Sequence, residues 1–224
     1  MVVGTSVGAL NGTVVADDPD AAADRLAALW STVTREDVFG KTLPTAYRLA
    51  SRQSSAIDSR ALQAFVERAI AGRDFADLKI PHTAITTDFD TGEMVPLRDG
   101  DLISAVMASA AIPAVFPVVE RNGRRLVDGG VVANVPIGVA AAQGAQTIVV
   151  LDCGFTVIAP QKEETLRANL LRMAAIMASQ QVRRDLEKVR DQTVLYLPGP
   201  WPIGSRPDDF RRSQELAAAA YELS

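Results

Sequence analysis

The sequence predicts a layered α/β fold with a largely parallel sheet and one antiparallel hairpin. Short runs of β-branched residues, such as residues 147–151, alternate along the chain with segments in which apolar residues recur at helical spacing. The 224 residues are enough for one substantial core, and 48% apolar and 22% charged residues are ordinary values for a globular domain. Because no internal repeat or linker interrupts the pattern, we expect a single domain over residues 1–224.

The first part of the chain is predicted to hold a short strand and three helices. Asp18 is a suitable N-cap for the second helix, with Pro19 in its first turn, and Gly72 is a suitable stop for the third. The polar segment 35–55 is interpreted as a loop or a short mobile helix. The expected helices cover residues 7–16, 18–32 and 58–72.

The remaining chain is predicted to contain strands separated by helices. Residues 147–151 form a continuous apolar run that is typical of a buried parallel strand. The apolar period over residues 164–190 predicts a long amphipathic helix that directs Met173 and Met177 inward. The expected strands are 81–87, 93–97, 147–151 and 193–197, the expected helices 101–111, 135–144, 164–190 and 208–221, the turns 90–92 and 122–123, and a loop 198–207.

The composition disfavours several classes of protein. A net charge of −4, from 23 basic and 27 acidic residues, offers no broad cationic surface for nucleic acid. No apolar run approaches the ~18 residues of a membrane span, and the first residues do not resemble a signal peptide. Cys153, the single cysteine, cannot form an internal disulfide and is interpreted as a small core residue. These features favour a cytoplasmic protein.

Residues 4–8, with the sequence G-T-S-V-G, match the pattern of a nucleophile elbow. In such a turn a strand passes abruptly into a helix and exposes the serine hydroxyl, here that of Ser6. Side chains in place of the flanking Gly4 and Gly8 are expected to collide with neighbouring backbone. The alternative is a Gly/Ser turn that merely caps a buried helix. Neither a P-loop nor a dinucleotide-binding glycine pattern is present.

A serine nucleophile needs a base, and two residues are candidates. His82, the single histidine, begins a strand and therefore lies at the edge of the sheet away from the expected site. Asp128 ends a strand-like run, and Gly129 and Gly130 after it permit close backbone approach, although an Asp-Gly-Gly turn is also common without function. Asp88 and Asp90 are explained by turn chemistry rather than by a metal site.

Four motifs in order resemble the patatin-like phospholipase family over nearly the whole chain: GTSVG at 4–8, DFDTG at 88–92, ASAAIPAVFPVV at 108–119 and DGGVVANVP at 128–136. Residues 209–212 are also similar to bacterial members. The resemblance implies a three-layer α/β/α sandwich with a mostly parallel central sheet. It implies a Ser6–Asp128 dyad that hydrolyses acyl esters of phospholipids or other lipids through an acyl-enzyme, with the Val7 N–H as an oxyanion donor. It implies no metal or organic cofactor, a lipid ester substrate and peripheral contact with a membrane.

In this family a first strand and a glycine-rich loop, G-G-G-x-[KR]-G, precede the elbow and supply further oxyanion donors. The sequence starts at Met1, three residues before Gly4, and lacks that segment. We therefore expect an N-terminally truncated sandwich with exposed sheet edge and apolar surface. The favoured hypothesis is that Met1 lies inside a longer reading frame of a lipid hydrolase. The alternatives are a catalytically impaired or non-enzymatic lipid- or protein-binding member and, with only the early glycines in support, a nucleotide-binding protein.

Overall fold

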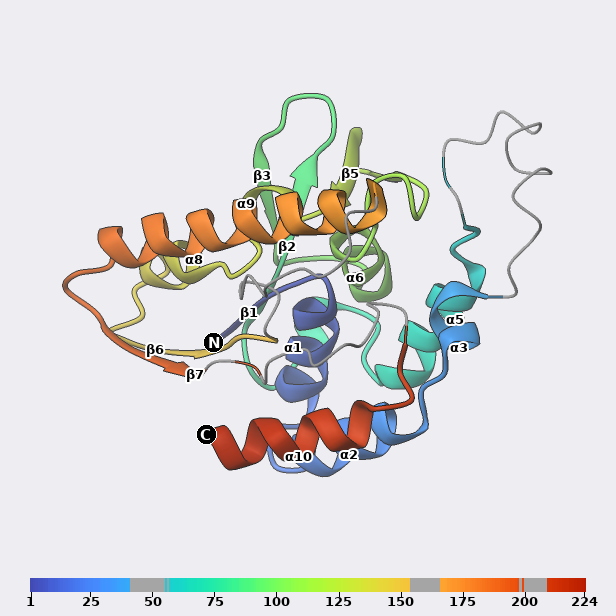
Figure 1. Cartoon of the computed structure of the whole chain (residues 1–224), viewed down its shortest axis with the longest axis horizontal. Helices are drawn as coiled ribbons and strands as arrows, with labels where there is room; N and C mark the ends of the chain where they lie inside the picture. Colours follow the sequence, from blue (N-terminus) through green and yellow to red (C-terminus); the bar gives the residue numbers. More distant parts are fainter. Residues whose placement is uncertain (41–54, 56, 154–165, 198, 200–208) are drawn as a thin grey trace.

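The computed structural model shows helices on both faces of a central sheet (Figure 1) and describes residues 1–40, 55, 57–153, 166–197, 199 and 209–224. The strands are β1 Val2–Thr5, β2 His82–Asp88, β3 Met94–Leu97, β4 Val119–Arg121, β5 Arg124–Asp128, β6 Thr147–Leu151 and β7 Thr193–Leu197. The helices are α1 Val7–Asp17, α2 Ala22–Thr32, α3 Arg35–Phe39, α5 Arg60–Ala69, α6 Leu102–Ser109, α7 Gly130–Ala133, α8 Ile137–Ala142, α9 Leu166–Lys188, α10 Ser213–Leu223 and a 3₁₀ turn at Phe75–Asp77.

The strand β2 lies at the centre of the main sheet and is buried along its whole length. Its successive side chains point to opposite faces. Ala84 belongs to the core formed with α1, α5 and α6, whereas Ile85 packs with Ala133 of α7 and Val139 of α8. Helices therefore cover both faces of the sheet, which confirms the predicted α/β/α layering (Figure 1).

The main sheet is mixed rather than mostly parallel. The strand order is β1-β2-β5-β4, and β3 also pairs with β2. Only the β1–β2 pairing in this sheet is parallel, whereas β3 and β5 pair with β2, and β4 with β5, in the antiparallel sense. Two of these antiparallel pairings arise at hairpin turns, one between β2 and β3 and one between β4 and β5. The turn at Asn122-Gly123, where both residues have positive φ, reverses the chain into β5, as the two-residue hairpin chemistry requires.

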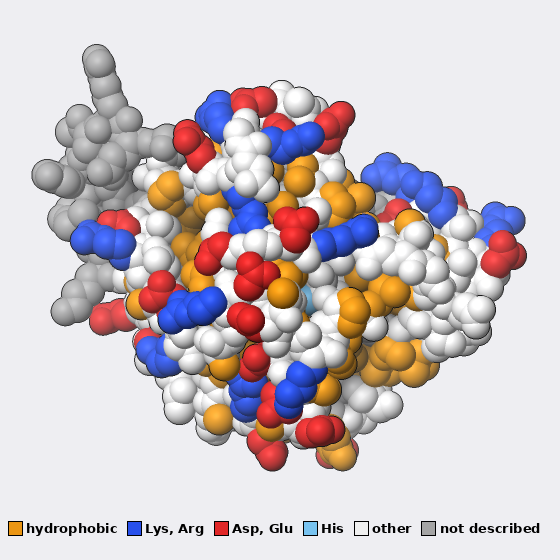
Figure 2. Space-filling view, turned by 180° about the vertical axis from the view of Figure 1, so that it is seen from behind, with side chains coloured by type: hydrophobic (Ala, Val, Ile, Leu, Met, Phe, Trp, Pro, Cys, Tyr) orange, Lys and Arg blue, Asp and Glu red, His pale blue; other side chains and the backbone are white. Residues whose placement is uncertain are grey.

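A second sheet consists of β6 and β7, paired in parallel. Its inner face packs against α8 and α9 through Ile148 and Val150, but Val149 and Leu151 are 57% and 78% exposed. Residues 147–151, which were expected to form a strand buried on both faces, are therefore covered on one face only. Figure 2, which views the molecule from behind, shows hydrophobic side chains at the surface on this side of the molecule. No described strand pairs with the second edge of β1.

Several local predictions were wrong. The second helix begins at Ala22, and the Asp18 carboxylate pairs with Lys79 instead of capping it. Met173 and Met177 are 58% and 56% exposed, so α9 does not direct its methionines inward. Cys153 is exposed rather than a core residue. The segment 35–55 contains α3, but residues 41–54 and nearly all of the expected loop 198–207 lie outside the described residues.

The segment before α10 is attached to the body of the molecule by aromatic packing. The ring of Phe210 lies 6.4 Å from that of Trp30 in α2 and 6.3 Å from that of Phe39 in α3. This contact explains how the 209–212 motif returns to the first helices of the chain. Among the described helices, none has a stretch that is both long and apolar enough to cross a lipid bilayer.

Candidate active site

The strands β1 and β5 lie end to end along one edge of β2. β1 pairs with residues 82–85 of β2 and β5 with residues 86–88, while β3 pairs with residues 84–87 and so overlaps both. Because β3 occupies one edge of β2 over this stretch, β1 and β5 must share the other edge. β1 is parallel to β2 and β5 is antiparallel to it, so their carboxyl ends face each other.

Ser6 and Asp128 lie where these two strand ends meet. Thr5, the last residue of β1, is opposite Ile85 of β2, and Asp128, the last residue of β5, is opposite Thr86. The Ser6 side chain lies close enough to the Asp128 carboxylate to lower the pKa of that carboxyl group. The strand topology therefore brings together the two residues that the sequence singled out as nucleophile and base.

Ser6 occupies a strained turn between β1 and α1. It is the N-cap residue of α1, with φ 55° and ψ −122°. A residue with a side chain rarely adopts such a backbone conformation, which costs about 1–3 kcal/mol and is found chiefly at functional sites. Val7, the next residue, begins α1 and is 38% exposed. Its N–H has no carbonyl partner within the helix and lies at the positive end of the helix dipole.

The two glycines of the elbow have different roles. A Cβ on Gly4 would lie 2.1 Å from the carbonyl oxygen of Gly8, so the strand and the first turn of α1 approach too closely for any side chain. A Cβ on Gly8 would meet no atom within 4 Å. The predicted collision is confirmed for Gly4 and wrong for Gly8, because the Cα of Gly8 faces open space while its carbonyl faces Gly4.

Sequence reasoning assigned no role to Ser109, the last residue of α6. Its side chain is fully buried, and its Oγ accepts a hydrogen bond from the Ser6 N–H at 2.9 Å. The same Oγ donates to the carbonyl oxygen of Ile85 at 2.6 Å. Ser109 belongs to the ASAAIPAVFPVV motif, which was the available signal, but nothing in the sequence shows which backbone group its hydroxyl contacts.

Asp128 is held by its backbone on two sides. Its N–H donates to Ala111 O at 3.0 Å, and its carbonyl oxygen accepts a hydrogen bond from the Thr87 hydroxyl at 3.0 Å. A Cβ on Gly129 would lie 2.3 Å from Ile85 O, so this glycine allows the turn after Asp128 to pack directly on β2. The prediction that glycine permits a close backbone approach at this turn is confirmed at Gly129.

The carboxylate of Asp128 lies in a protected environment. The residue is 5% exposed, and Oδ1 accepts a hydrogen bond from the Gly130 N–H at 2.7 Å. Burial raises the pKa of Asp128 to about 6, because water solvates the charged form poorly there; the hydrogen bonds from Ser6 and Gly130 partly offset this rise. A carboxyl group with a pKa near 6 is ionised at neutral pH and can still hold a proton transiently, as a general base requires.

His82 lies away from Ser6. It pairs with Val2, at the opposite end of β1 from the elbow, and its ring stacks on Phe75. Burial lowers its pKa to about 4, and the Nδ1 atom lies 3.3 Å from Val2 O. This environment fits the predicted structural role of the histidine.

Asp88 and Asp90 stabilise the turn that precedes β3. Asp88 Oδ1 accepts hydrogen bonds from the N–H groups of Asp90 and Thr91 at 3.0 and 3.2 Å. Asp88 also pairs with Arg124, and Asp90 with Arg125. These contacts support the interpretation as turn chemistry.

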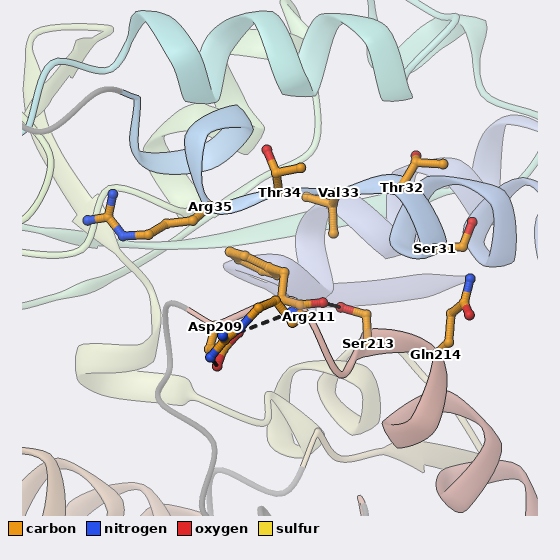
Figure 3. Close-up of a pocket in the computed structure, with 10 residues that line it drawn as sticks. Ser31, Thr32, Val33, Thr34, Arg35, Asp209, Arg211, Ser213 and Gln214 are labelled. Carbon is orange, nitrogen blue, oxygen red and sulfur yellow. Dashed lines mark hydrogen bonds and ion pairs between the residues drawn. The ribbon is translucent and has the colours of Figure 1, made fainter.

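A cavity of about 630 Å³ lies between the end of α2 and the segment before α10 (Figure 3). Several of its polar side chains are already engaged: Asp209 pairs with Arg211, and Thr34 bonds with Asp37. None of its lining residues belongs to the elbow or to the turn after Asp128. The cavity therefore contributes nothing to the Ser6–Asp128 arrangement.

Comparisons with known proteins show what the chain is similar to. A sequence model of the family described as patatin-like phospholipase matches residues 1–141. The human patatin-like phospholipase domain-containing protein 6 is 27% identical over 156 residues, which cover 69% of this chain and 11% of that protein. A patatin-like phospholipase domain-containing protein of Caenorhabditis elegans is 32% identical over 157 residues, again 69% of this chain and 11% of the relative. An NTE family protein of Mycobacterium tuberculosis is 34% identical over 86 residues, which are 38% of this chain and 24% of that protein.

The matched region contains the elbow, both strands that meet at Ser6 and Asp128, and the helix α6 that contacts the two residues. It spans more than half of the chain, whereas the residues aligned with the animal relatives make up about a tenth of the length of those proteins. The family name and the names of these relatives indicate lipid hydrolysis as the general activity. The chain belongs to the patatin-like phospholipase family.

Proposed function

We propose that this chain carries the catalytic site of a serine acyl hydrolase that cleaves fatty-acyl ester bonds of phospholipids or other lipids. The observation that carries the proposal is the placement of the strained Ser6 beside the buried carboxylate of Asp128, where the ends of β1 and β5 meet on β2. Membership of the family supplies the substrate class. The relatives are much longer than this chain, so the lipid class and the activity of the whole protein belong to the proposal as well.

The proposed reaction has two steps. In the first, Asp128 accepts the proton of Ser6 while Oγ attacks the ester carbonyl carbon, and it then gives this proton to the departing alcohol as the acyl-enzyme forms. In the second, Asp128 takes a proton from a water molecule that attacks the acyl carbon. Ser6 Oγ leaves with that proton, and the fatty acid is released.

The negative charge that develops on the carbonyl oxygen requires donors that are already in place. The N–H of Val7 is one such donor, because it has no partner within α1 and the helix N-terminus carries partial positive charge. The exposed position of Val7 beside the half-buried Ser6 leaves room for an ester to approach.

Covalent labelling tests the nucleophile. We expect a fluorophosphonate probe to label the protein at Ser6, and Ser6→Ala to abolish both the label and the hydrolysis of a p-nitrophenyl acyl ester. Ser104→Ala, at an α6 serine away from the elbow, is the control and should keep both. Labelling at another serine, or esterase activity that survives Ser6→Ala, would contradict the assignment.

The non-enzymatic alternative predicts a different result. A lipid-binding member would bind vesicles equally well with Ser6 or alanine at this position and would accept no label. Folded, lipid-binding protein that remains unlabelled would therefore favour this alternative over hydrolysis.

The pH dependence tests the base. Only ionised Asp128 can accept the proton of Ser6, so kcat/KM should fall about tenfold for each pH unit below the pKa of about 6 and should level off above it. The measurement is ester hydrolysis between pH 4.5 and 8 over times in which the protein stays folded. A profile that remains flat down to pH 5 would show that a carboxyl group with an ordinary pKa, or a different base, is used.

A further inference from the structure

The end of α6 contacts the backbone on both sides of the candidate site. Ser109 accepts the Ser6 N–H through its hydroxyl, and Ala111, two residues later, accepts the Asp128 N–H through its carbonyl oxygen at 3.0 Å. Both bonds run from the strand ends that meet beside β2 to one short piece of chain. This piece is therefore placed to fix the separation between the nucleophile and the base.

The Ser6 N–H has no acceptor in regular secondary structure. β1 ends at Thr5 and α1 begins at Val7, so the Ser6 N–H lies outside both hydrogen-bond patterns, although the Ser6 carbonyl oxygen accepts bonds from Ala9 and Leu10 of α1. The N–H instead donates to the Ser109 hydroxyl. A buried backbone N–H without an acceptor is strongly unfavourable, so the Ser109 hydroxyl stabilises the strained conformation itself.

The orientation of the Ser109 hydroxyl is fixed by its second bond. Its proton points to Ile85 O at 2.6 Å, which leaves an oxygen lone pair for the Ser6 N–H. The same Ile85 carbonyl is the group that Gly129 approaches most closely. The elbow and the turn after Asp128 are thus both held against one peptide group of β2.

We propose that Ser109 is a positioning residue for the reaction proposed above, which holds the Ser6 turn in the conformation that places its hydroxyl on Asp128. The proposal goes beyond the dyad and rests on the proposed function. Ser109 itself exchanges no proton with the substrate, since its hydroxyl is buried and used on both sides.

Three variants test this role. Ser109→Ala removes both bonds and should lower kcat about 10- to 100-fold with little change in KM. Ser109→Thr keeps a hydroxyl and should restore much of the rate if the added methyl group is accommodated. Ser104→Ala, half-buried on the same helix, is the matched control and should behave as wild type.

Two further readouts separate positioning from general loss of structure. Because the hydrogen bond from Ser6 lowers the pKa of Asp128, a displaced Ser6 should move the acidic limb of the pH–rate profile of Ser109→Ala upward from about 6. The hydrogen exchange of the Ser6 amide, followed by NMR, should become at least about tenfold faster in this variant while amides of β2 keep their protection.

The exchange measurement also separates this inference from the proposed function. The wild-type protein could prove inactive while the Ser6 amide still exchanges faster in Ser109→Ala. This pair of results would support the backbone contact and contradict the hydrolase. Wild-type kcat together with unchanged Ser6 exchange in Ser109→Ala would overturn the positioning role. Uniformly faster exchange throughout the sheet would overturn it too, because it would show a general structural role.

Discussion

Replacing Asp128 by asparagine is expected to lower ester hydrolysis by about 100- to 10,000-fold and, at the same time, to stabilise the protein at neutral pH. Asparagine has nearly the same shape as aspartate. Its side-chain oxygen can still accept the Gly130 N–H, and its amide can donate to Ser6 Oγ. What the variant removes is the ability to accept a proton and the cost of a buried charge.

The sign of the stability change follows from the pKa of Asp128. Folding raises it from an ordinary value of 3.8 to about 6, so between these pH values the folded state binds more protons than the unfolded state. The stability contributed by this group therefore falls as the pH rises through that window. Once the carboxyl is ionised in both states, the destabilisation is about 3 kcal/mol, which Asp128→Asn should recover above pH 6 but not below pH 4.

Urea unfolding of wild type and Asp128→Asn at pH 4 and pH 7.5 measures this difference directly. Asp88→Asn is the matched control from the neighbouring strand. Burial by itself would raise the pKa of Asp88, but the N–H groups of Thr91 and Asp90 and the Arg124 guanidinium hold it below the ordinary value. Asp88→Asn should therefore destabilise at neutral pH. Equal destabilisation by both variants would mean that Asp128 is a structural turn residue rather than a base.

The two site residues could be predicted from the sequence because each is marked by a local pattern. Ser6 has Gly4 and a following helix, and Asp128 has a strand before it and Gly129 after it. Their proximity was implied by family resemblance, but its physical cause is topological. β1 and β5 share one edge of β2 only because the chain makes a hairpin into β3 and another into β5, and a largely parallel sheet was the wrong expectation.

Other features depend on tertiary contacts that leave no periodic pattern. Ser109 is a small polar residue in a helix of small residues, and only the fold places Ser6 and Ile85 on either side of its hydroxyl. The outward direction of Met173 and Met177 is set by which face of α9 packs on α7 and α8, through residues such as Val182. Helical spacing predicts that a helix has two faces but not which neighbour covers each.

Alanine substitutions at the two elbow glycines are expected to have opposite effects on stability. At Gly4 the new Cβ would lie 2.1 Å from Gly8 O and 2.7 Å from Ala9 N, and both are backbone atoms of the first turn of α1. Relief would require α1 to move away from β1, which displaces Ser6 as well. We expect Gly4→Ala to cost at least about 3 kcal/mol of unfolding free energy and to abolish fluorophosphonate labelling.

Gly8→Ala is the matched variant four residues later on the same turn. The Cβ enters open space, and alanine is favoured over glycine in a helix by roughly 0.5–1 kcal/mol, so this variant should be slightly more stable than wild type. The free energies of unfolding of the two variants, measured by denaturant titration, should therefore differ by about 4 kcal/mol. Equal loss of stability in both would contradict the close contact at Gly4. A stable Gly8→Ala protein that labels normally but hydrolyses esters slowly would place the substrate in the open space beside Gly8, since only a bound molecule could then meet the added methyl group.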